Sequence, residues 1–334
     1  MAVSVKDVAA AASVSVGTVS NVLNQPAKVA PATVERVMNA ISELGYVRND
    51  AARQLRAGRS RCIGLVVLDV GNPFFAEVAR GAEARAAEAG MTVLLGSSDE
   101  RLDRESTYLD LFQEQRVNGV LVTPATEDLA PLARLRDAGV PVVLVDRETI
   151  GGEYLSVAVD DIQGGQLAVS HLLELGRRRI AFIGGPLATR QVADRLEGAR
   201  RAVAAVAGAT LEVIETRALT VLQGRAAGEA LVGRGAADRP DAVFAANDLL
   251  AVGLLQGLSL LADLRVPDDI ALIGYDDIDF ASATVVPLSS IRQPASLIGY
   301  TAVDVLLAEI SGGDGHERNV RFQPELVVRA STGG

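Results

Sequence analysis

The chain lacks several features that membrane proteins and secreted proteins need. It has one cysteine, Cys62, so it cannot form an internal disulfide, and this suits a reducing compartment. It contains no run of eighteen apolar residues and no basic-then-apolar leader. We therefore expect a cytoplasmic protein that makes no contact with a membrane, with Cys62 in a small buried site at the start of a strand.

Residues suited to catalysis or metal binding are also scarce. Neither histidine, His171 or His316, stands beside a serine or cysteine nucleophile in a strand-to-helix elbow. No phosphate-binding Gly-Lys-Ser loop is present, and Gly184-Gly185 by itself is a weak signal. Metal-ligand spacings are absent as well. We expect no enzymatic activity, no cofactor and no metal site, and we place His171 on a partly buried helix face.

The charges that are present are unevenly divided. The formal net charge is −10, from 32 basic and 42 acidic residues, and taken over the whole chain it argues against DNA binding. Residues 1–61, however, hold eight basic and four acidic residues and so carry +4, which leaves −14 for the remainder. A basic segment on an acidic body confines the attraction for phosphates to one end of the chain.

The basic segment begins with the pattern of two helices and a tight turn. Apolar residues spaced three or four apart predict a first helix within 4–12 and a second within 16–24. Val14 in the turn is expected to pack between the two helices, and Ser15 to cap the second. In a helix-turn-helix, the second helix presents its first residues to base edges in the major groove. The alternative for this segment alone is a helical hairpin with no role in DNA binding.

A third helix and a short arginine-rich segment follow. Pro31 stands near the first position of this helix, and Gly45 ends it. Residues 49–61 carry four arginines on a helix-forming run with too few apolar residues to bury a face. Because the first turn of a short helix is costly to form, we expect this segment to fold on contact with phosphates. The apolar stripe predicted for the third helix comprises Val34, Val37, Ile41 and Leu44.

From Cys62 onward, short apolar runs alternate with helical stretches. Continuous apolar runs separated by helices are typical of buried parallel strands, and they predict two doubly wound α/β halves. Paired lobes of this kind close over a ligand at the carboxyl ends of their strands. We place strands of the first half within 62–70, 92–97, 119–124 and 141–147, and strands of the second half within 156–160, 179–185, 241–248 and 269–277.

Polar and aromatic side chains stand just past the ends of these strands. Sugar hydroxyls both donate and accept hydrogen bonds, so carboxylates, amides and guanidinium groups pair with them, while aromatic faces cover the C–H surface of the ring. Each residue also has a structural alternative, such as capping a helix, lying in a turn or belonging to the core. The candidate ligand-binding residues are Asn72, Phe74, Phe75, Asp146, Arg147, Asn247 and Asp276, with Arg195 near the start of a helix and Gln293 in a segment expected to cross between the lobes.

Taken in order, several short motifs resemble the lactose-repressor (LacI/GalR) family of bacterial transcription regulators. The resemblance runs from Ser4 to about Thr332. It implies an α/β fold class, with a small all-helical helix-turn-helix head and a two-lobed, doubly wound domain like the periplasmic binding proteins. The motifs are KDVAAAASVSVGTVSNVLN from Lys6, ELGYVRNDAARQLR from Glu43, NPFF at 72–75, VDR at 145–147, AAND at 245–248, GYDDI at 274–278 and IRQP at 291–294.

The same resemblance implies domain boundaries and partners. Residues 1–48 would form the helix-turn-helix DNA-binding domain, 49–61 a hinge helix linker, and 62–334 the effector-binding and dimerisation domain. A homodimer would place two recognition helices on a pseudo-palindromic operator in double-stranded DNA. A dimer is expected rather than a tetramer, because no leucine-heptad tail follows the second lobe.

Three recognition-helix positions match those that choose bases in the family: Val16, Gly17 and Asn21. Val16 offers only apolar contact, for instance to a thymine methyl group, and Gly17 lets the backbone come close. Asn21 can pair with adenine through two hydrogen bonds. The residues assigned to phosphate contacts or to capping are Thr18, Ser20 and Asn24.

Two residues depart from the commonest family pattern. Ser13 stands where a glycine often sits in the turn, and Asn21 replaces a frequent arginine, which leaves the base preference open.

In the linker, Leu55 matches the leucine that wedges into the minor groove at the operator centre and kinks the duplex. Arg53 and Arg56 beside it are expected to contact phosphates and to make binding dependent on salt.

The resemblance also suggests an effector. Asp146, Arg195, Asn247 and Asp276 match positions that contact effectors in sugar- and purine-responsive members of the family. The nine candidate residues together resemble the pocket of ribose-binding proteins, so a small sugar, ribose or a related pentose, is the expected effector and release from the operator the expected response. The alternative is a global catabolite regulator controlled by a phosphorylated carrier protein. A transport receptor is disfavoured by the missing signal sequence and the basic head.

Overall fold

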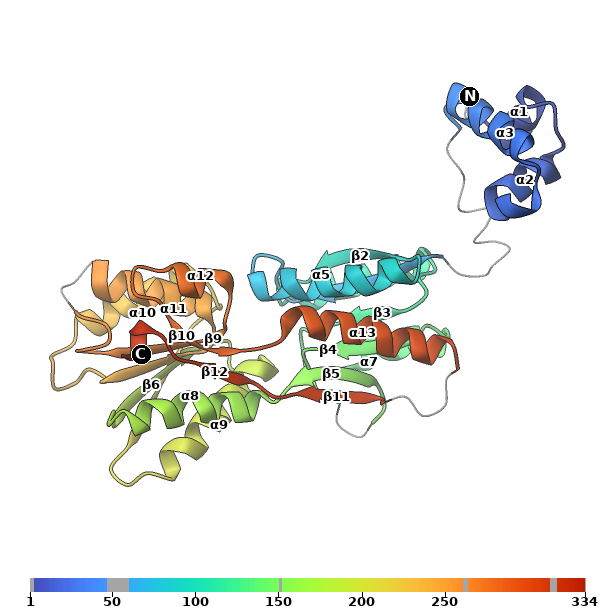
Figure 1. Ribbon diagram of the computed structural model, residues 1–334. Helices are drawn as coiled ribbons and strands as arrows, with labels where there is room; N and C mark the ends of the chain where they lie inside the picture. Colours follow the sequence, from blue (N-terminus) through green and yellow to red (C-terminus); the bar gives the residue numbers. More distant parts are fainter. Residues whose placement is uncertain (1–2, 47–59, 150–151, 261–263, 313–316, 334) are drawn as a thin grey trace. The chain divides into compact units, whose positions relative to one another are not determined.

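The computed structural model of this protein describes residues 3–46, 60–149, 152–260, 264–312 and 317–333. The chain divides into two compact units, Met1–Ser60 and Arg61–Gly334 (Figure 1). Within the described ranges, no helix combines the length and the apolar character that crossing a membrane requires.

The first unit is a three-helix head. Its helices are α1 (Val5–Ala11), α2 (Val16–Asn24) and α3 (Pro31–Leu44), with a short 3-10 turn, η1 (Pro26–Lys28), between the last two. The three helices pack on one another because the apolar residues of each, at the predicted spacing, share one face. The buried residues of this small core are Val8, Ala9, Ala12, Val19, Val22, Val37 and Ala40.

The ends of these helices are set by local contacts that the sequence predicts. Ser15 Oγ accepts a hydrogen bond from the Thr18 backbone N–H at 3.0 Å, which caps α2. Pro31 opens α3, and Gly45 ends it with φ +61°, in the left-handed region that favours glycine. The prediction for Leu44 is wrong: it is exposed, and Ala40 lies on the buried face instead, because α3 ends at Leu44, beyond the small core.

The tight turn of the head contains a strained residue. Ser13 has φ +51°, a conformation that costs a residue other than glycine about 1 kcal/mol. The backbone N–H of Val14 donates to Ala9 O at 3.0 Å, and Val14 packs partly buried against the core, as predicted. Ser13 thus adopts the conformation that glycine would adopt without strain.

The first lobe of the second unit is a parallel sheet with helices on both faces. Its strand order is β11-β5-β4-β3-β1-β2. Helices α5 (Pro73–Glu88) and α13 (Ala295–Ile310) pack together over one face, while α6 (Leu102–Glu114) and α7 (Ala130–Asp137) lie on the other. The strands are β1 (Cys62–Val67), β2 (Thr92–Ser97), β3 (Val120–Val122), β4 (Val142–Val145), β5 (Leu155–Val159) and β11 (Asn319–Phe322).

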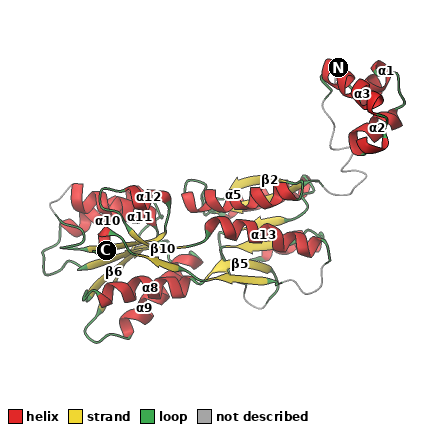
Figure 2. Ribbon diagram, in the orientation of Figure 1, coloured by secondary structure: helices red, strands yellow, loops and turns green. Residues whose placement is uncertain are grey.

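The second lobe repeats this plan, with strand order β12-β10-β9-β8-β6-β7. Neighbouring strands are parallel except for the β10–β12 pair, which is antiparallel. Figure 2 shows the strands of both lobes lying among their helices. The strands are β6 (Arg179–Gly184), β7 (Thr210–Glu215), β8 (Ala242–Ala245), β9 (Ala271–Asp276), β10 (Ser289–Arg292) and β12 (Glu325–Val327). The helices are α8 (Asp161–Glu174), α9 (Arg190–Ala204), α10 (Val221–Val232), α11 (Asp248–Leu255), which continues as a π-helical turn (Gln256–Leu260), and α12 (Asp279–Ala283).

The chain passes between the lobes after β5, after β10 and between β11 and β12. Gln293 lies at the second of these passages, as predicted. The assignment of 156–160 to the second half is wrong, because β5 pairs with β4 and β11 in the first sheet and the chain leaves that lobe only afterwards. The two doubly wound lobes are confirmed.

Two predictions for single residues have different outcomes. His171 lies half-buried on α8, as predicted, with Nε2 2.9 Å from the Thr332 hydroxyl. Cys62 does open β1, but it is half-buried rather than buried, and its Sγ lies 3.3 Å from Thr92 Oγ1 on the edge strand β2. The lower burial follows from this position, since only β2 lies beyond β1 at that edge of the sheet.

Candidate functional site

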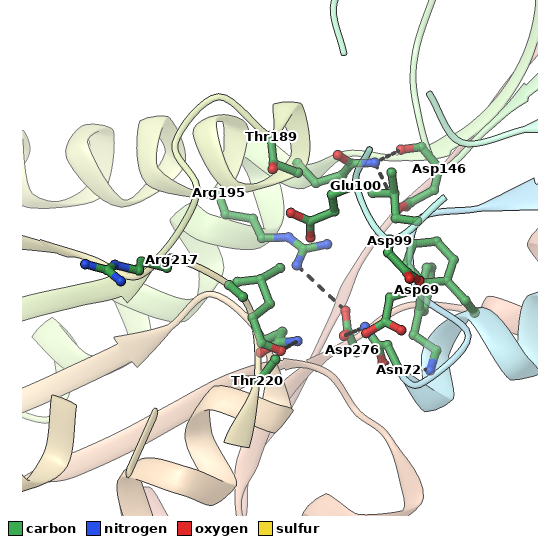
Figure 3. Close-up of a pocket in the computed structure, with 17 residues that line it drawn as sticks. Asp69, Asn72, Asp99, Glu100, Asp146, Thr189, Arg195, Arg217, Thr220 and Asp276 are labelled. Atoms are coloured by element: carbon green, nitrogen blue, oxygen red, sulfur yellow. Dashed lines mark hydrogen bonds and ion pairs between the residues drawn. The ribbon is translucent and has the colours of Figure 1, made fainter. Parts of the chain in front are cut away.

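A cavity of about 320 Å³ lies between the lobes, at the carboxyl ends of strands from both sheets (Figure 3). This is near the lower end of the range for small-molecule sites, so it suits one small ligand. Of the nine ligand-binding candidates, seven line the cavity: Asn72, Phe74, Phe75, Asp146, Arg195, Asn247 and Asp276.

Asp276 is the centre of a polar cluster at the end of β9. Its carboxylate accepts hydrogen bonds from Gln293 Nε2 at 2.8 Å and from Asn72 Nδ2 at 3.4 Å. Arg195 Nη1 lies 3.8 Å from Asp276 Oδ1, an ion pair drawn in Figure 3. Burial raises the pKa of Asp276 to about 6, while Arg195, Gln293 and Asn72 act to lower it. Asp276 therefore titrates close to neutral pH.

The turn that carries Asp276 is held in a strained conformation by a second buried carboxylate. Asp276 and Asp277 have φ of +101° and +54°, both in the left-handed region. Asp248, at the start of α11, accepts from the Ile278 backbone N–H at 2.9 Å and from the Ser290 hydroxyl at 2.7 Å. These bonds tie the turn to α11 and β10, and burial raises the pKa of Asp248 well above its usual value.

Arg195 is a buried cation whose guanidinium is held by contacts from several elements. Nε donates to Asp161 at 2.8 Å and Nη1 donates to the Ala246 carbonyl at 2.8 Å. The guanidinium also lies 3.8 Å above the centre of the Tyr275 ring. Helix α8 can approach this residue because Gly165 has no side chain: a Cβ there would lie 2.0 Å from the Arg195 carbonyl oxygen.

Asp146 links the two lobes. Gln191, on α9 of the second lobe, donates through Nε2 to the Asp146 carbonyl at 2.7 Å and to its Oδ2 at 3.1 Å. The other carboxylate oxygen, Oδ1, is buried and has no partner within the described part of the chain. Burial raises the pKa of Asp146 well above its usual value, and the charge of Asp161 adds to this effect. A buried oxygen without a partner marks a place where a ligand group can bind.

Arg147 and Gln293 do not line the cavity. Arg147 turns to a neighbouring cavity of about 130 Å³, where Nη1 donates to the Thr126 carbonyl at 2.5 Å and Nη2 to Glu127 at 2.9 Å. Arg147 lies beyond the end of β4 at Val145, and these two hydrogen bonds hold its side chain. Gln293 acts on the cavity through its bond to Asp276.

The structural alternatives also hold for several cavity residues. Asn247 caps α11 by accepting from the Leu250 backbone N–H at 2.9 Å, and its amide donates to Leu219 O at 3.3 Å. Phe74 and Phe75 are core residues whose rings meet edge to face, with centres 5.1 Å apart. A residue can thus serve the fold and still present an edge to the cavity.

The sequence reasoning missed part of the lining. Asp69, Asp99 and Glu100 follow β1 and β2, so the rule that selected Asn72 and Asp146 would also have found them. The segment after β7 was missed because that strand itself was not predicted. Gln191 was missed because no sequence pattern in the first turn of α9 marks it as a ligand-binding residue. The further polar lining residues are Asp69, Asp99, Glu100, Thr189, Gln191, Arg217 and Thr220.

In the head, the first turn of α2 presents an open surface. Val16 is 42% exposed, and a Cβ at Gly17 would meet only Ser15 Oγ, at 3.6 Å. Asn21 is exposed on the same helix. Thr18 and Asn24 have capping contacts within α2: Thr18 Oγ1 lies 2.9 Å from Ser15 Oγ, and Asn24 Nδ2 donates to Ser20 O at 2.8 Å. The linker candidates Arg53, Leu55 and Arg56 lie outside the described residues.

Two family descriptions match the chain. Residues 4–49 match the bacterial regulatory proteins of the lacI family, and residues 169–332 match the periplasmic binding protein-like domain. The first match covers the helix-turn-helix and the second covers most of the second lobe. The two descriptions therefore agree with the head and the lobed body seen in the structure.

Similar proteins cover nearly the whole chain. The HTH-type transcriptional repressor PurR of Vibrio vulnificus (strain CMCP6) is 35% identical over 330 residues, 97% of each chain. The ribose operon repressor of Escherichia coli (strain K12) is 36% identical over 332 residues, 98% of each. A crystal structure of the lac repressor dimer bound to operator and the anti-inducer ONPF superposes with a TM-score of 0.85, 28% identity and 99% coverage of both chains. This chain therefore belongs to the lacI family of bacterial regulatory proteins and is a DNA-binding regulator of transcription.

Proposed function

We propose that this protein is a repressor that releases its operator when a small sugar, ribose or a related pentose, fills the cavity between the lobes. The observation that carries the proposal is the cluster around Asp276, where a carboxylate, two amides and a guanidinium meet at the end of β9. Sugar hydroxyls donate to carboxylates and accept from amides, so this set can bind adjacent hydroxyls of one ring. The similarity to the Escherichia coli ribose operon repressor supports the same effector.

The DNA side of the proposal rests on the exposed start of α2. Val16 would contact a thymine methyl group, Gly17 would let the backbone approach the base edges, and Asn21 would pair with adenine. Thr18, Ser20 and Asn24 would contact phosphates from the same helix. We propose that the linker residues Arg53, Leu55 and Arg56 bind at the operator centre. The protein would then act in the bacterial cytoplasm, where its operator is.

We propose a homodimer on a pseudo-palindromic operator. The lac repressor structure that this chain matches is a dimer on its operator. In the second lobe, Phe280 on α12 and Val285 just after it are 60% and 87% exposed. Exposed apolar side chains close together in the sequence are typical of a surface that a partner covers, and a second copy of the chain would bury them.

Effector binding would act through contacts that already join the lobes. Asp146 and Gln191 connect them on one side of the cavity, and Asn72 and Asp276 connect them on the other. A sugar bound to both lobes would stabilise the closed arrangement and so shift the balance between forms that hold and release DNA. The alternative, a catabolite regulator controlled by a phosphorylated carrier protein, receives no support from the relatives above, none of which is named for such a carrier.

The direct test is calorimetric titration of the full-length dimer with ribose. We expect saturable binding of one ribose per chain, and we expect ribose to lower the affinity for an operator selected from random DNA, measured by fluorescence anisotropy. Arabinose, glucose, adenosine and hypoxanthine form the comparison panel. Tighter binding of hypoxanthine or adenosine than of any sugar would replace the pentose with a purine effector, and no binding of any compound would refute the effector site.

Ribose affinity should depend on pH through Asp276. Only the ionised carboxylate can accept hydrogen bonds from two hydroxyls through both of its oxygens. The pKa of Asp276 is about 6 in the free protein. Binding therefore favours the ionised form. The ribose affinity is highest above this pKa and falls as the pH falls through it, by about tenfold per pH unit once the pH is well below the pKa. Calorimetry between about pH 5 and 8 checks this. An affinity that rises on acidification would show that the protonated form binds the sugar.

A further inference from the structure

Three acidic residues from loops of the first lobe form one wall of the cavity mouth, and we call them the acidic rim: Asp69, Asp99 and Glu100. Asp69 follows β1, and the other two follow β2 (Figure 3). Asp99 and Glu100 have φ of +48° and +57°, so two consecutive residues other than glycine hold the left-handed conformation. Strained backbone of this kind persists only where the surrounding structure fixes it.

Two of the three rim carboxylates, those of Asp69 and Glu100, have no ion pair within the described part of the chain. Asp99 forms an ion pair with Arg104 outside the cavity and accepts from the Ser97 hydroxyl. The Asp69 carboxylate accepts a hydrogen bond from the Gly71 backbone N–H at 2.7 Å. Glu100 has no hydrogen bond or ion pair with the rest of the described chain. Asp69 and Glu100 both line the cavity, and burial together with the charge of Asp69 raises the pKa of Glu100.

The lining contains two arginines, Arg195 and Arg217. Arg195 is already bound by Asp161 and Asp276. Arg217 is exposed, and Figure 3 shows its guanidinium directed away from the other lining side chains. Asp146 Oδ1 is buried without a hydrogen-bond partner in the described chain, which costs free energy. A ligand group that donates a hydrogen bond to this oxygen would remove that cost. The cavity as a whole is therefore built for groups that donate hydrogen bonds and against groups that carry negative charge.

We propose that the acidic rim is a charge filter that admits a free sugar and excludes its phosphate esters. A phosphate adds close to two negative charges, and like charges placed together in an interface cost several kcal/mol. The regulator would thus respond to the sugar before its phosphorylation and not to the product of that step. This inference rests on the proposed function, since it concerns the specificity of the same cavity.

The test compares ribose, ribose 5-phosphate and ribose 1-phosphate by calorimetry on the full-length protein. We expect the affinity for each phosphate to be lower than the affinity for ribose by about 100-fold or more. In the double variant Asp69→Asn/Glu100→Gln, which keeps the shape of the rim but removes two charges, this discrimination should fall about tenfold for at least one phosphate. Both residues line the cavity, so the ribose affinity of the double variant is measured as well, and the ratio of the ribose affinity to each phosphate affinity reports the filter.

The control variant is Glu114→Gln, which removes one exposed carboxylate at the far end of α6 and should leave all three affinities unchanged. High salt should also narrow the discrimination in the unmodified protein, because it screens charge and not shape. Phosphates that bind as well as ribose, or discrimination that survives in the double variant, would overturn the filter and leave the sugar site standing. Failure of ribose to bind would overturn the proposed function and the filter with it.

Discussion

Replacing Arg195 by alanine should lower the free energy of unfolding by about 3–5 kcal/mol, as is typical when one member of a buried ionic cluster is removed. The side chain is 4% exposed, and it is the cation that faces Asp146, Asp161 and Asp276. Without it, these buried carboxylates repel one another, Asp161 loses the hydrogen bond from Nε, and Asp276 loses its ion pair. Urea unfolding at fixed protein concentration measures the change.

The control lies on the same helix. Arg201 pairs with Glu197 across one turn of α9, but the two side chains are 54% and 42% exposed. An exposed pair of this kind contributes less than about 1 kcal/mol, so Arg201→Ala should alter stability only slightly. Equal losses in the two variants would mean that Arg195 stabilises the lobe no more than a surface residue does, and the cluster would then not be an organising element of the second lobe.

Replacing Asp276 by asparagine should weaken ribose binding about 100-fold while the protein remains folded and binds its operator. The amide keeps the shape of the carboxylate but accepts at only one oxygen, and hydrogen bonds to a charged group contribute about 1.5–3 kcal/mol each. Stability should change little, because burial already disfavours the charge, as its pKa of about 6 shows. Calorimetry with ribose and operator anisotropy with and without ribose measure the two properties separately.

Asp279→Asn provides the matched control, since this exposed residue stands three positions further along, in the first turn of α12. It should bind ribose with unchanged affinity. If Asp276→Asn also responded to ribose like the unmodified protein, Asp276 would be only a turn residue, the structural alternative that its strained backbone allows.

The features that could be predicted from the sequence depend on neighbouring residues or on one general rule of sheet topology. The head was predictable because apolar residues repeat with helical spacing around Val8, Val19 and Val37, one in each helix. Ser15 and Gly45 in addition act on the backbone next to them. Six of the seven candidates that line the cavity were predictable because parallel strands place their carboxyl ends together, so that residues after four strands converge.

The features that could not be predicted depend on contacts between distant segments. Short strands and edge strands gave weak signals: β10, β11 and β12 have three or four residues each, and the edge strand β7 is largely exposed. The direction of Arg147, away from the cavity, is set by its contact with Glu127, which is distant in the sequence. The pairing of Gln191 with Asp146 joins two lobes whose arrangement no local pattern specifies.

The sequence by itself thus determined the three-helix head, the two doubly wound lobes and the strand ends at which a ligand site would form, because periodicity and capping act over a few residues. Only the tertiary structure decided which acidic groups share the cavity, which carboxylate lacks a partner and where charge goes unbalanced. The physical reason is that burial, pairing and repulsion of charges depend on distances in space between residues as far apart as Asn72 and Asp276.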